Sequence, residues 1–207
     1  MLGNDVVDLK DPETQAGMQH PRFDLRVFAQ EERARIARSG APERLRWIMW
    51  AAKEAAYKVA RKLDARAVFA PSRFVVRADE RLRGEVELPE GRRIPLVVRA
   101  DAEFVHAIAS DRADFERELV EGLGALGPCT ARDESRRARE FATLGLAREL
   151  GRPAEQLSIE KRGRIPQLLL AGVDAAVDLA LSHHGRFAAF ACELTQPLQR
   201  IEAGRSR

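Results

Sequence analysis

The sequence predicts an α+β fold built from two pseudo-symmetric halves, each with a small antiparallel sheet packed on a long helix. Two observations carry this prediction. Apolar residues recur with helical spacing over 43–63 and again over 133–150, and short apolar segments separated by polar turns follow both. Each half also closes on an apolar strand of small residues, 104–109 in the first and 187–194 in the second. Helices first and a hairpin last, in both halves, favour two related units packed together.

The first half, residues 1–112, begins with a short apolar segment that is compatible with a strand buried on both faces. A shorter and a long helical pattern follow it. A meander of antiparallel strands with polar turns completes this half. The first strand is expected at 2–9, the helices at 30–38 and 43–63, and the meander at 74–77, 84–88, 94–98 and 103–109.

The second half, residues 113–207, is expected to contain two helices, at 115–126 and 133–150, and Gly151 and Pro153 end the second of them. Short strands are expected at 157–160, 176–182 and 187–194. The tail at 200–207 is polar and basic, which predicts a loose segment.

The composition is that of an ordinary globular protein. The chain has 35 Lys and Arg against 32 Asp and Glu, and the resulting charge of +3 is too small to indicate nucleic acid binding by itself. Cys129 and Cys192 lack the spacing of metal ligands, and a buried free thiol is expected at Cys192. The sequence shows neither a signal peptide pattern nor a membrane-spanning stretch, so we expect a cytoplasmic protein.

The long helix carries a second, polar and aromatic side. Its apolar side is expected to pack on its own sheet, whereas the opposite side is expected to meet the other half, because tryptophan is unusual on a face meant for water. The alternative is a solvated surface with an ordinary ion pair between Glu54 and Lys58, one helical turn apart. The residues on this second side are Trp47, Trp50, Glu54, Tyr57, Lys58 and Arg61.

A buried strand at 2–9 would place Asp5 and Val7 on one face. A carboxylate there is costly to bury unless it is paired or binds a cation. Glu54 is the candidate partner, because two carboxylates from different elements form an ordinary Mg²⁺ site. The alternative is that Asp5 caps a turn or pairs with an arginine. Asp8 should point the other way or lie just past the strand, where a capping role near Asp11 is the simpler expectation.

Ser182 and His183 lie at the end of a predicted strand, which is a common place for ligand contacts. His183 could donate a hydrogen bond to a phosphate oxygen, but a histidine at a hairpin turn is also often a plain surface residue. A Ser-His nucleophile pair is disfavoured, because adjacent strand residues point to opposite faces. Arg164, in a basic turn, could meet an anion nearby or simply be solvated.

Together these segments resemble the 4′-phosphopantetheinyl transferase superfamily, whose members include the holo-acyl-carrier-protein synthase and surfactin-synthetase-activating types. The resemblance touches both halves, and the three main segments together are more specific than any one. Gly3-Asn4-Asp5-Val6-Val7 looks like the family's G-x-D segment, residues 50–58 like W-x-x-K-E-x-x-x-K, Leu181-Ser182-His183 like L-S-H, and residues 28–32 like F-x-x-x-E.

The resemblance implies transfer of the 4′-phosphopantetheine arm of coenzyme A to a serine of an apo acyl or peptidyl carrier protein, with release of 3′,5′-ADP. It implies that Asp5 and Glu54 bind Mg²⁺, and that Glu54 also helps to deprotonate the serine. Lys58 would neutralise the transferring phosphate. Coenzyme A phosphates would contact Ser182 and His183, and Arg164 is a further candidate contact. The expected carriers serve fatty-acid, polyketide or peptide synthesis.

Two departures from the family's pattern matter. Val7 stands where surfactin-synthetase-type members have a second acid, so a water would fill that coordination position. The halves also look circularly permuted relative to two-half members, and two halves per chain favour a monomer. These departures leave open a non-catalytic coenzyme A-binding or assembly protein that uses the aromatic side of the helix as an interface. A metal-dependent hydrolase is weaker, because the sequence offers no cluster to activate water.

Overall fold

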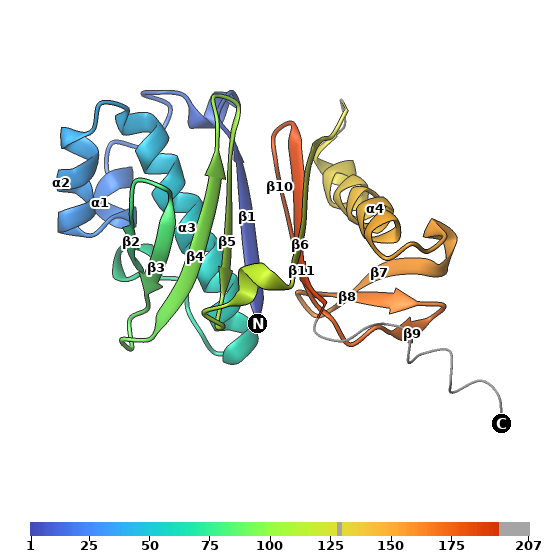
Figure 1. Cartoon of the computed structure of the whole chain (residues 1–207). Coiled ribbons are helices and arrows are strands. Elements are labelled where there is room, and N and C mark those ends of the chain that lie inside the picture. The colour runs from blue at the N-terminus through green and yellow to red at the C-terminus, as the bar shows by residue number, and fades with distance from the viewer. Residues whose placement is uncertain (128–129, 195–207) are drawn as a thin grey trace.

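The computed structural model describes residues 1–127 and 130–194, and it has four layers (Figure 1). Two antiparallel sheets lie in the middle and contact each other through strands from both ends of the chain. Helix α3 covers the outer side of the first sheet and α4 that of the second. The predicted α+β class is therefore confirmed. None of the described helices combines the length and apolar character needed to cross a membrane.

The first sheet has the strand order β1-β5-β4-β3-β2, and all of its strands are antiparallel. The predicted first strand, the two helices and the meander are confirmed, with ends shifted by a few residues. The strands are β1 (Leu2–Asp8), β2 (Val75–Ala78), β3 (Arg83–Glu87), β4 (Arg93–Ala100) and β5 (Phe104–Ser110). The helices are α1 (Phe23–Val27), α2 (Gln30–Arg38) and α3 (Pro42–Leu63), with short 3-10 turns η1 (Pro12–Thr14) and η2 (Pro71–Arg73).

The remaining strands form two smaller sheets, in the orders β10-β11-β6 and β7-β8-β9. Of these strands, β6, β8 and β9 were not predicted, whereas the helix at 133–150 and the three predicted strands are confirmed. The strands are β6 (Leu119–Ala125), β7 (Leu157–Arg162), β8 (Ile165–Leu170), β9 (Val173–Asp174), β10 (Asp178–His184) and β11 (Phe187–Glu193). The helical elements are η3 (Phe115–Arg117), α4 (Ala131–Glu149) and η4 (Ala154–Gln156).

The predicted helix at 115–126 is wrong, because only η3 is helical there and β6 follows it. Two alternate glycines explain the strand. A Cβ on Gly122 would lie 2.2 Å from the ring of Phe190, and one on Gly124 would lie 2.5 Å from the ring of Phe141. Because glycine has no Cβ atom, β6 can lie close to these rings and pair with β11. The side chains that decide this are distant in sequence, so the local apolar pattern misled the prediction.

Small residues let the two sheets approach each other. Ala180 of β10 and Ala191 of β11 pack against Leu2 and Ile108 of the first sheet in one buried cluster. Polar contacts cross the same boundary, since the Ser110 hydroxyl donates to the Glu193 carboxylate at 3.1 Å and Lys62 Nζ lies 2.5 Å from Asp178 Oδ1. Cys192 is buried and free, as predicted, whereas Cys129 and the tail at 200–207 lie outside the described residues.

The tryptophans of α3 do not meet the second half, which corrects that expectation for them, whereas Tyr57, Lys58 and Arg61 of the same side line a cavity shared with the second half. Phe23 of α1 packs against both Trp47 and Trp50, with ring centroids 5.8 Å apart in each case. Phe69 stacks on Tyr57 at 4.7 Å. The segments on either side of α3 in the sequence fold back over the helix, so both tryptophans pack against rings of the first half. Only the C-terminal turns of α3 reach the second half, for example through Lys62.

A fully buried ion pair joins α2, α3 and the start of β2. Lys53 and Glu32 are both 0% exposed, and Lys53 Nζ lies 2.6 Å from Glu32 Oε2. Lys53 also donates to the carbonyl oxygens of Pro71 and Phe74, while Glu32 accepts hydrogen bonds from the backbone of Ala29 and Val76. Burial lowers the pKa of Lys53, and the charge of Glu32 opposes that change. The pair is thus costly to desolvate but supplied with hydrogen bonds on both sides.

A second ion pair ties the end of β1 to the turn after β10. Asp8 is 1% exposed and accepts hydrogen bonds from Nε, Nη2 and the backbone N–H of Arg186, at 2.7 to 2.9 Å. It also accepts from Lys10 N–H in the turn after β1, whereas the N-cap of η1 is Asp11 and not Asp8. Burial by itself would raise the pKa of Asp8, but the hydrogen bonds from Arg186 outweigh it, and the net pKa falls from 3.8 to about 2.

We expect Glu32→Gln or Lys53→Met alone to destabilise the protein by about 3–5 kcal/mol, because each leaves an uncompensated buried partner. Urea unfolding would measure the loss. The double variant should lose less than the sum of the single ones, since it removes both charges together. Additive losses, or single losses below about 1 kcal/mol, would contradict this assignment.

We expect Asp8→Asn to lose about 1–2 kcal/mol at neutral pH, a range that allows for screening at the half-exposed Arg186. The folded pKa of Asp8 is depressed, so the contribution is present above its ordinary pKa and is lost as the pH falls through about 2. The midpoint temperatures of thermal unfolding of the wild type and of Asp8→Asn should therefore become equal as the pH is lowered. Exposed Glu90 gives a matched control, Glu90→Gln, which should follow the wild type at every pH.

Candidate functional site

Gly3 allows β1 to lie directly against α3. A Cβ at this position would lie 2.1 Å from the carbonyl oxygen of Ala55, which no side chain could tolerate. The close approach brings the next residue on the same face of β1, Asp5, to the polar side of α3. Val7, the third residue on this face, is buried in the core of the first half. The glycine of the G-x-D pattern therefore has a steric cause.

Asp5, Glu54 and Lys58 converge between β1 and α3. Lys58 Nζ lies 2.9 Å from Asp5 Oδ1 and donates to the carbonyl oxygen of Asn4 at 2.7 Å. Glu54 is one turn before Lys58 on α3 and is half-buried. In the described part of the chain, the side chain of Glu54 forms no hydrogen bond or ion pair. The structure thus brings together the three residues that the sequence singled out here.

The carboxyl group of Glu54 is poised to change its charge near neutral pH. Burial raises its pKa, the neighbouring charge of Asp5 raises it further, and Lys58 opposes both, with a net value of about 7 instead of 4.5. A protonated fraction of Glu54 is thus present at neutral pH when nothing else neutralises the two acids.

The pair of carboxylates fits a hard divalent cation. Mg²⁺ prefers oxygen ligands and commonly takes one or two carboxylates from the protein, with its other positions left to water and phosphate oxygens. Asp5 and Glu54 offer such a set from two rigid elements. Their mutual repulsion, visible in the raised pKa of Glu54, is what a cation between them would relieve. Val7 offers no third ligand.

A cavity of about 410 Å³ opens beside Lys58 and runs along the C-terminal half of α3. Its floor is β10 and its far wall is the β7–β8 hairpin. The lining is mixed, with apolar surface and several cations, which suits a ligand that has both apolar and anionic parts. The lining residues are Tyr57, Lys58, Arg61, Lys62, Ala65, Arg162, Arg164, Ile165, Pro166, Ala180 and Leu181.

His183 and Arg164 line a second, smaller cavity of about 120 Å³ that shares Arg164 with the first. Ser135 and Arg139 of α4 and Lys161 of β7 also face it. The charge of Lys58 lowers the pKa of His183, after the larger effect of burial, so His183 lies within electrostatic range of the Asp5 site. The smaller cavity is strongly basic and suits an anionic group.

Ser182 lies apart from His183. It is 6% exposed and sits on the side of β10 that faces the first sheet, as Ala180 does. Its hydroxyl has no hydrogen-bond partner within the described residues. His183 instead points to α4, because adjacent residues of a strand face opposite sides. Ser182 thus faces the first sheet, whereas His183 faces α4.

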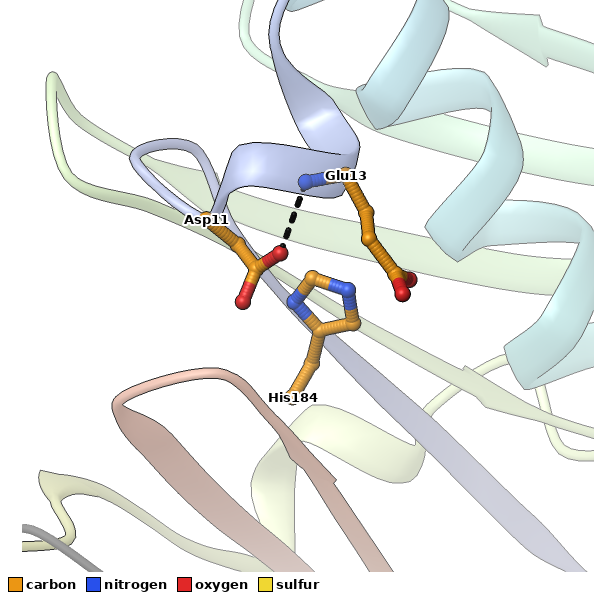
Figure 2. Close-up of side chains that lie close together, drawn as sticks. All are labelled: Asp11, Glu13 and His184. Carbon is orange, nitrogen blue, oxygen red and sulfur yellow. Dashed lines mark hydrogen bonds between the residues drawn. The ribbon is translucent and has the colours of Figure 1, made fainter. Parts of the chain in front are cut away.

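Asp11, Glu13 and His184 form another small cluster near the turn after β10 (Figure 2). One atom of each residue that could bind a metal, a carboxylate oxygen or a ring nitrogen, lies within 4.8 Å of those of the other two. His184 Nδ1 accepts a hydrogen bond from Asp8 N–H at 3.1 Å, so the neutral ring carries its proton on Nε2. Neither ring nitrogen then offers a free lone pair to a metal. We assign His184 to the contact between β1 and β10.

The sequence reasoning missed the residues that α4 brings to the smaller cavity. Ser135 and Arg139 are four residues apart and therefore share a face of α4. That spacing was a usable signal, but the same helix carries many charged residues in the same rhythm. Only the packing of α4 on β10 shows which of them face the cavity.

A family model described as the 4′-phosphopantetheinyl transferase superfamily matches residues 1–109. The match spans β1 to β5 and includes Asp5, Glu54 and Lys58. No curated protein matches the chain.

We expect Glu54→Gln to stabilise the metal-free protein by about 1–3 kcal/mol near pH 8. The folded pKa of Glu54 is raised, so ionised Glu54 opposes folding above about pH 7 and ceases to do so as the pH falls toward 4.5. Unfolding in EDTA at both ends of this range would measure the effect. An equally stable or weaker Glu54→Gln protein in alkali would contradict it, and Glu80→Gln, at an exposed turn, serves as the control.

Proposed function

The chain belongs to the 4′-phosphopantetheinyl transferase superfamily, and from this premise we propose that it uses Mg²⁺ to transfer the arm of coenzyme A to a serine of an apo carrier protein. Phosphopantetheinyl transfer is the general activity of this superfamily. The observation that supports the specific reaction is the convergence of Asp5, Glu54 and Lys58 within the matched residues.

The metal would be held by Asp5 and Glu54, and when bound it supplies positive charge to the pyrophosphate of coenzyme A. Lys58, which contacts Asp5 here, turns toward the transferring phosphate and neutralises it. Glu54 takes the proton of the attacking serine, directly or through water. The serine oxygen forms a bond to the phosphorus that carries the pantetheine arm, while the bond from that phosphorus to the 3′,5′-ADP oxygen breaks.

Coenzyme A is the co-substrate that the two cavities suit best. The larger one adjoins Lys58 and offers an apolar surface with cations along it. In the described part of the chain, Arg162 and Arg164 have no ion-pair partner, so their charge is available to phosphate groups. His183 faces the smaller basic cavity and would contact another phosphate. Ser182 would have to be reached from the boundary between the sheets.

The proposed carrier would meet the surface around α1. Arg22 and Arg26 are exposed there, next to Leu25, which is 60% exposed. An acidic helix of a carrier would complement such a surface. We also propose that residues 1–112 and 113–207 act as two halves that close one site within a single chain, so that the protein functions as a monomer in the cytoplasm, without nucleic acid or membrane.

The non-catalytic alternative loses one of its supports. It used the aromatic side of α3 as an interface, but Trp47 is buried and Trp50 packs against Phe23 within the first half. A binding protein would also gain nothing from keeping the unpaired, half-buried carboxylate of Glu54.

We expect intact-mass analysis to detect one phosphopantetheine added to an apo carrier after incubation with the protein, coenzyme A and Mg²⁺, and no addition in EDTA. Asp5→Ala and Glu54→Ala should each reduce the rate by about a hundredfold or more. Each change removes a proposed ligand of the Mg²⁺ ion, whose positive charge acts on the reacting phosphate. Glu80→Ala, at an exposed turn, should retain the rate.

Undiminished transfer by Asp5→Ala and Glu54→Ala would reject the metal assignment. Binding of coenzyme A without transfer to any carrier would favour the non-catalytic alternative. Hydrolysis of coenzyme A without a carrier would favour the metal-dependent hydrolase.

A further inference from the structure

The imidazole of His183 is held on both sides by consecutive residues of α4. Its Nε2 lies 3.1 Å from the hydroxyl of Ser135, and its Nδ1 lies 3.4 Å from Oε2 of Glu134. Both contacts join the first turns of α4 to the end of β10. The side chains of Glu134 and His183 are each about one third exposed, and Ser135 and His183 line the smaller cavity.

The two contacts fix the chemistry of the ring. The contact with Glu134 is electrostatic, and a carboxylate favours the tautomer that places the ring proton on the nitrogen facing it, Nδ1. Nε2 is then an acceptor, and the Ser135 hydroxyl donates to it. An anionic group could replace Ser135 at Nε2 only if His183 gained a second proton there.

The wider surroundings of His183 oppose that second proton, and Glu134 favours it. Burial lowers the pKa of His183 most, and the nearby cations Lys58 and Lys161, with His184, lower it further. Glu134 acts in the opposite direction. His183 is therefore uncharged in the free protein at neutral pH, and it becomes a cation when a negative group arrives beside it.

Resting on the function proposed above, we propose that Glu134 is a positioning residue for coenzyme A binding. Its carboxylate faces Nδ1 of His183 and stabilises the imidazolium whose Nε2–H takes an anionic group of coenzyme A in place of Ser135. The rest of the smaller cavity suits that group, because Arg139, Lys161 and Arg164 face it and none of them forms an ion pair within the described residues.

A nucleophilic role for Ser135 is the other interpretation of these contacts, since the order acid, histidine, serine is that of a catalytic triad. Ser135 lies within α4, however, and not on the sharp strand-to-helix turn that exposes such a nucleophile. The three cations of the cavity suit a bound anion better than an uncharged carbonyl group. The geometry therefore favours anion binding.

The test is a calorimetric titration of coenzyme A into the wild type and Glu134→Gln across about pH 6 to 8. Gln keeps an acceptor for Nδ1–H but removes the charge. We expect Glu134→Gln to bind up to about tenfold more weakly at the alkaline end, where His183 must gain its proton, and the difference to narrow as the pH falls. In the transferase assay, KM for coenzyme A should rise accordingly while kcat at saturation stays within about twofold.

Glu140→Gln is the matched control, because Glu140 lies on the same helix but pairs with Arg136 on an exposed surface. It should bind coenzyme A as the wild type does. Equal affinity of Glu134→Gln and wild type at every pH, or a fall in kcat with KM unchanged, would overturn the positioning role alone. A wild type that fails to bind coenzyme A at all would overturn the proposed function with it.

Discussion

The buried pair of Lys53 and Glu32 is the constraint on which the rest of the first half depends. Both side chains are fully buried and cannot hydrogen-bond to water, so their hydrogen-bond partners must come from α2 and from the chain around Phe74. This fixes the rotation of α3 about its own axis. Glu54, the next residue, is turned by about 100° from Lys53 and so faces β1. A structural charge, Lys53, and a charge that we propose to be functional, Glu54, thus stand side by side in the sequence and point in different directions.

Much of this was readable from the sequence, and the reasons are physical. Helical spacing places Glu54 and Lys58 on one face of a helix, and Asp5 was linked to Glu54 because a buried carboxylate needs a partner and because the segment resembles the family's motif. The role of Lys53 could not be read from that spacing, because its partner Glu32 lies on another helix and is defined only by packing. The strand β6 was missed for a related reason, since Gly122 and Gly124 become informative only once the rings that fill their space are known.

The site itself was predictable in part. Sequence order suggests that Ser182 and His183 act together, but a strand sends them to opposite faces, one toward the first sheet and one toward α4. Glu134 carries no motif, and its contact with His183 depends on how α4 crosses β10. Residues that hold a functional side chain in place are generally harder to predict than the side chain itself, because distant packing chooses them.

The strands β1 and β6 show why, among the described residues, the first half has a carboxylate facing its long helix and the second half has none at the matching position. Each precedes the long helix of its half and pairs with the last strand of that half. The helix-facing positions of β1 are Gly3, Asp5 and Val7, whereas those of β6 are Val120, Gly122 and Gly124. Where the first half has a carboxylate, the second has space that Phe190 fills. At this position the second half thus has apolar packing on its own helix in place of a charge. Its contribution to the candidate site is the cavity wall formed by β10 and the β7–β8 hairpin.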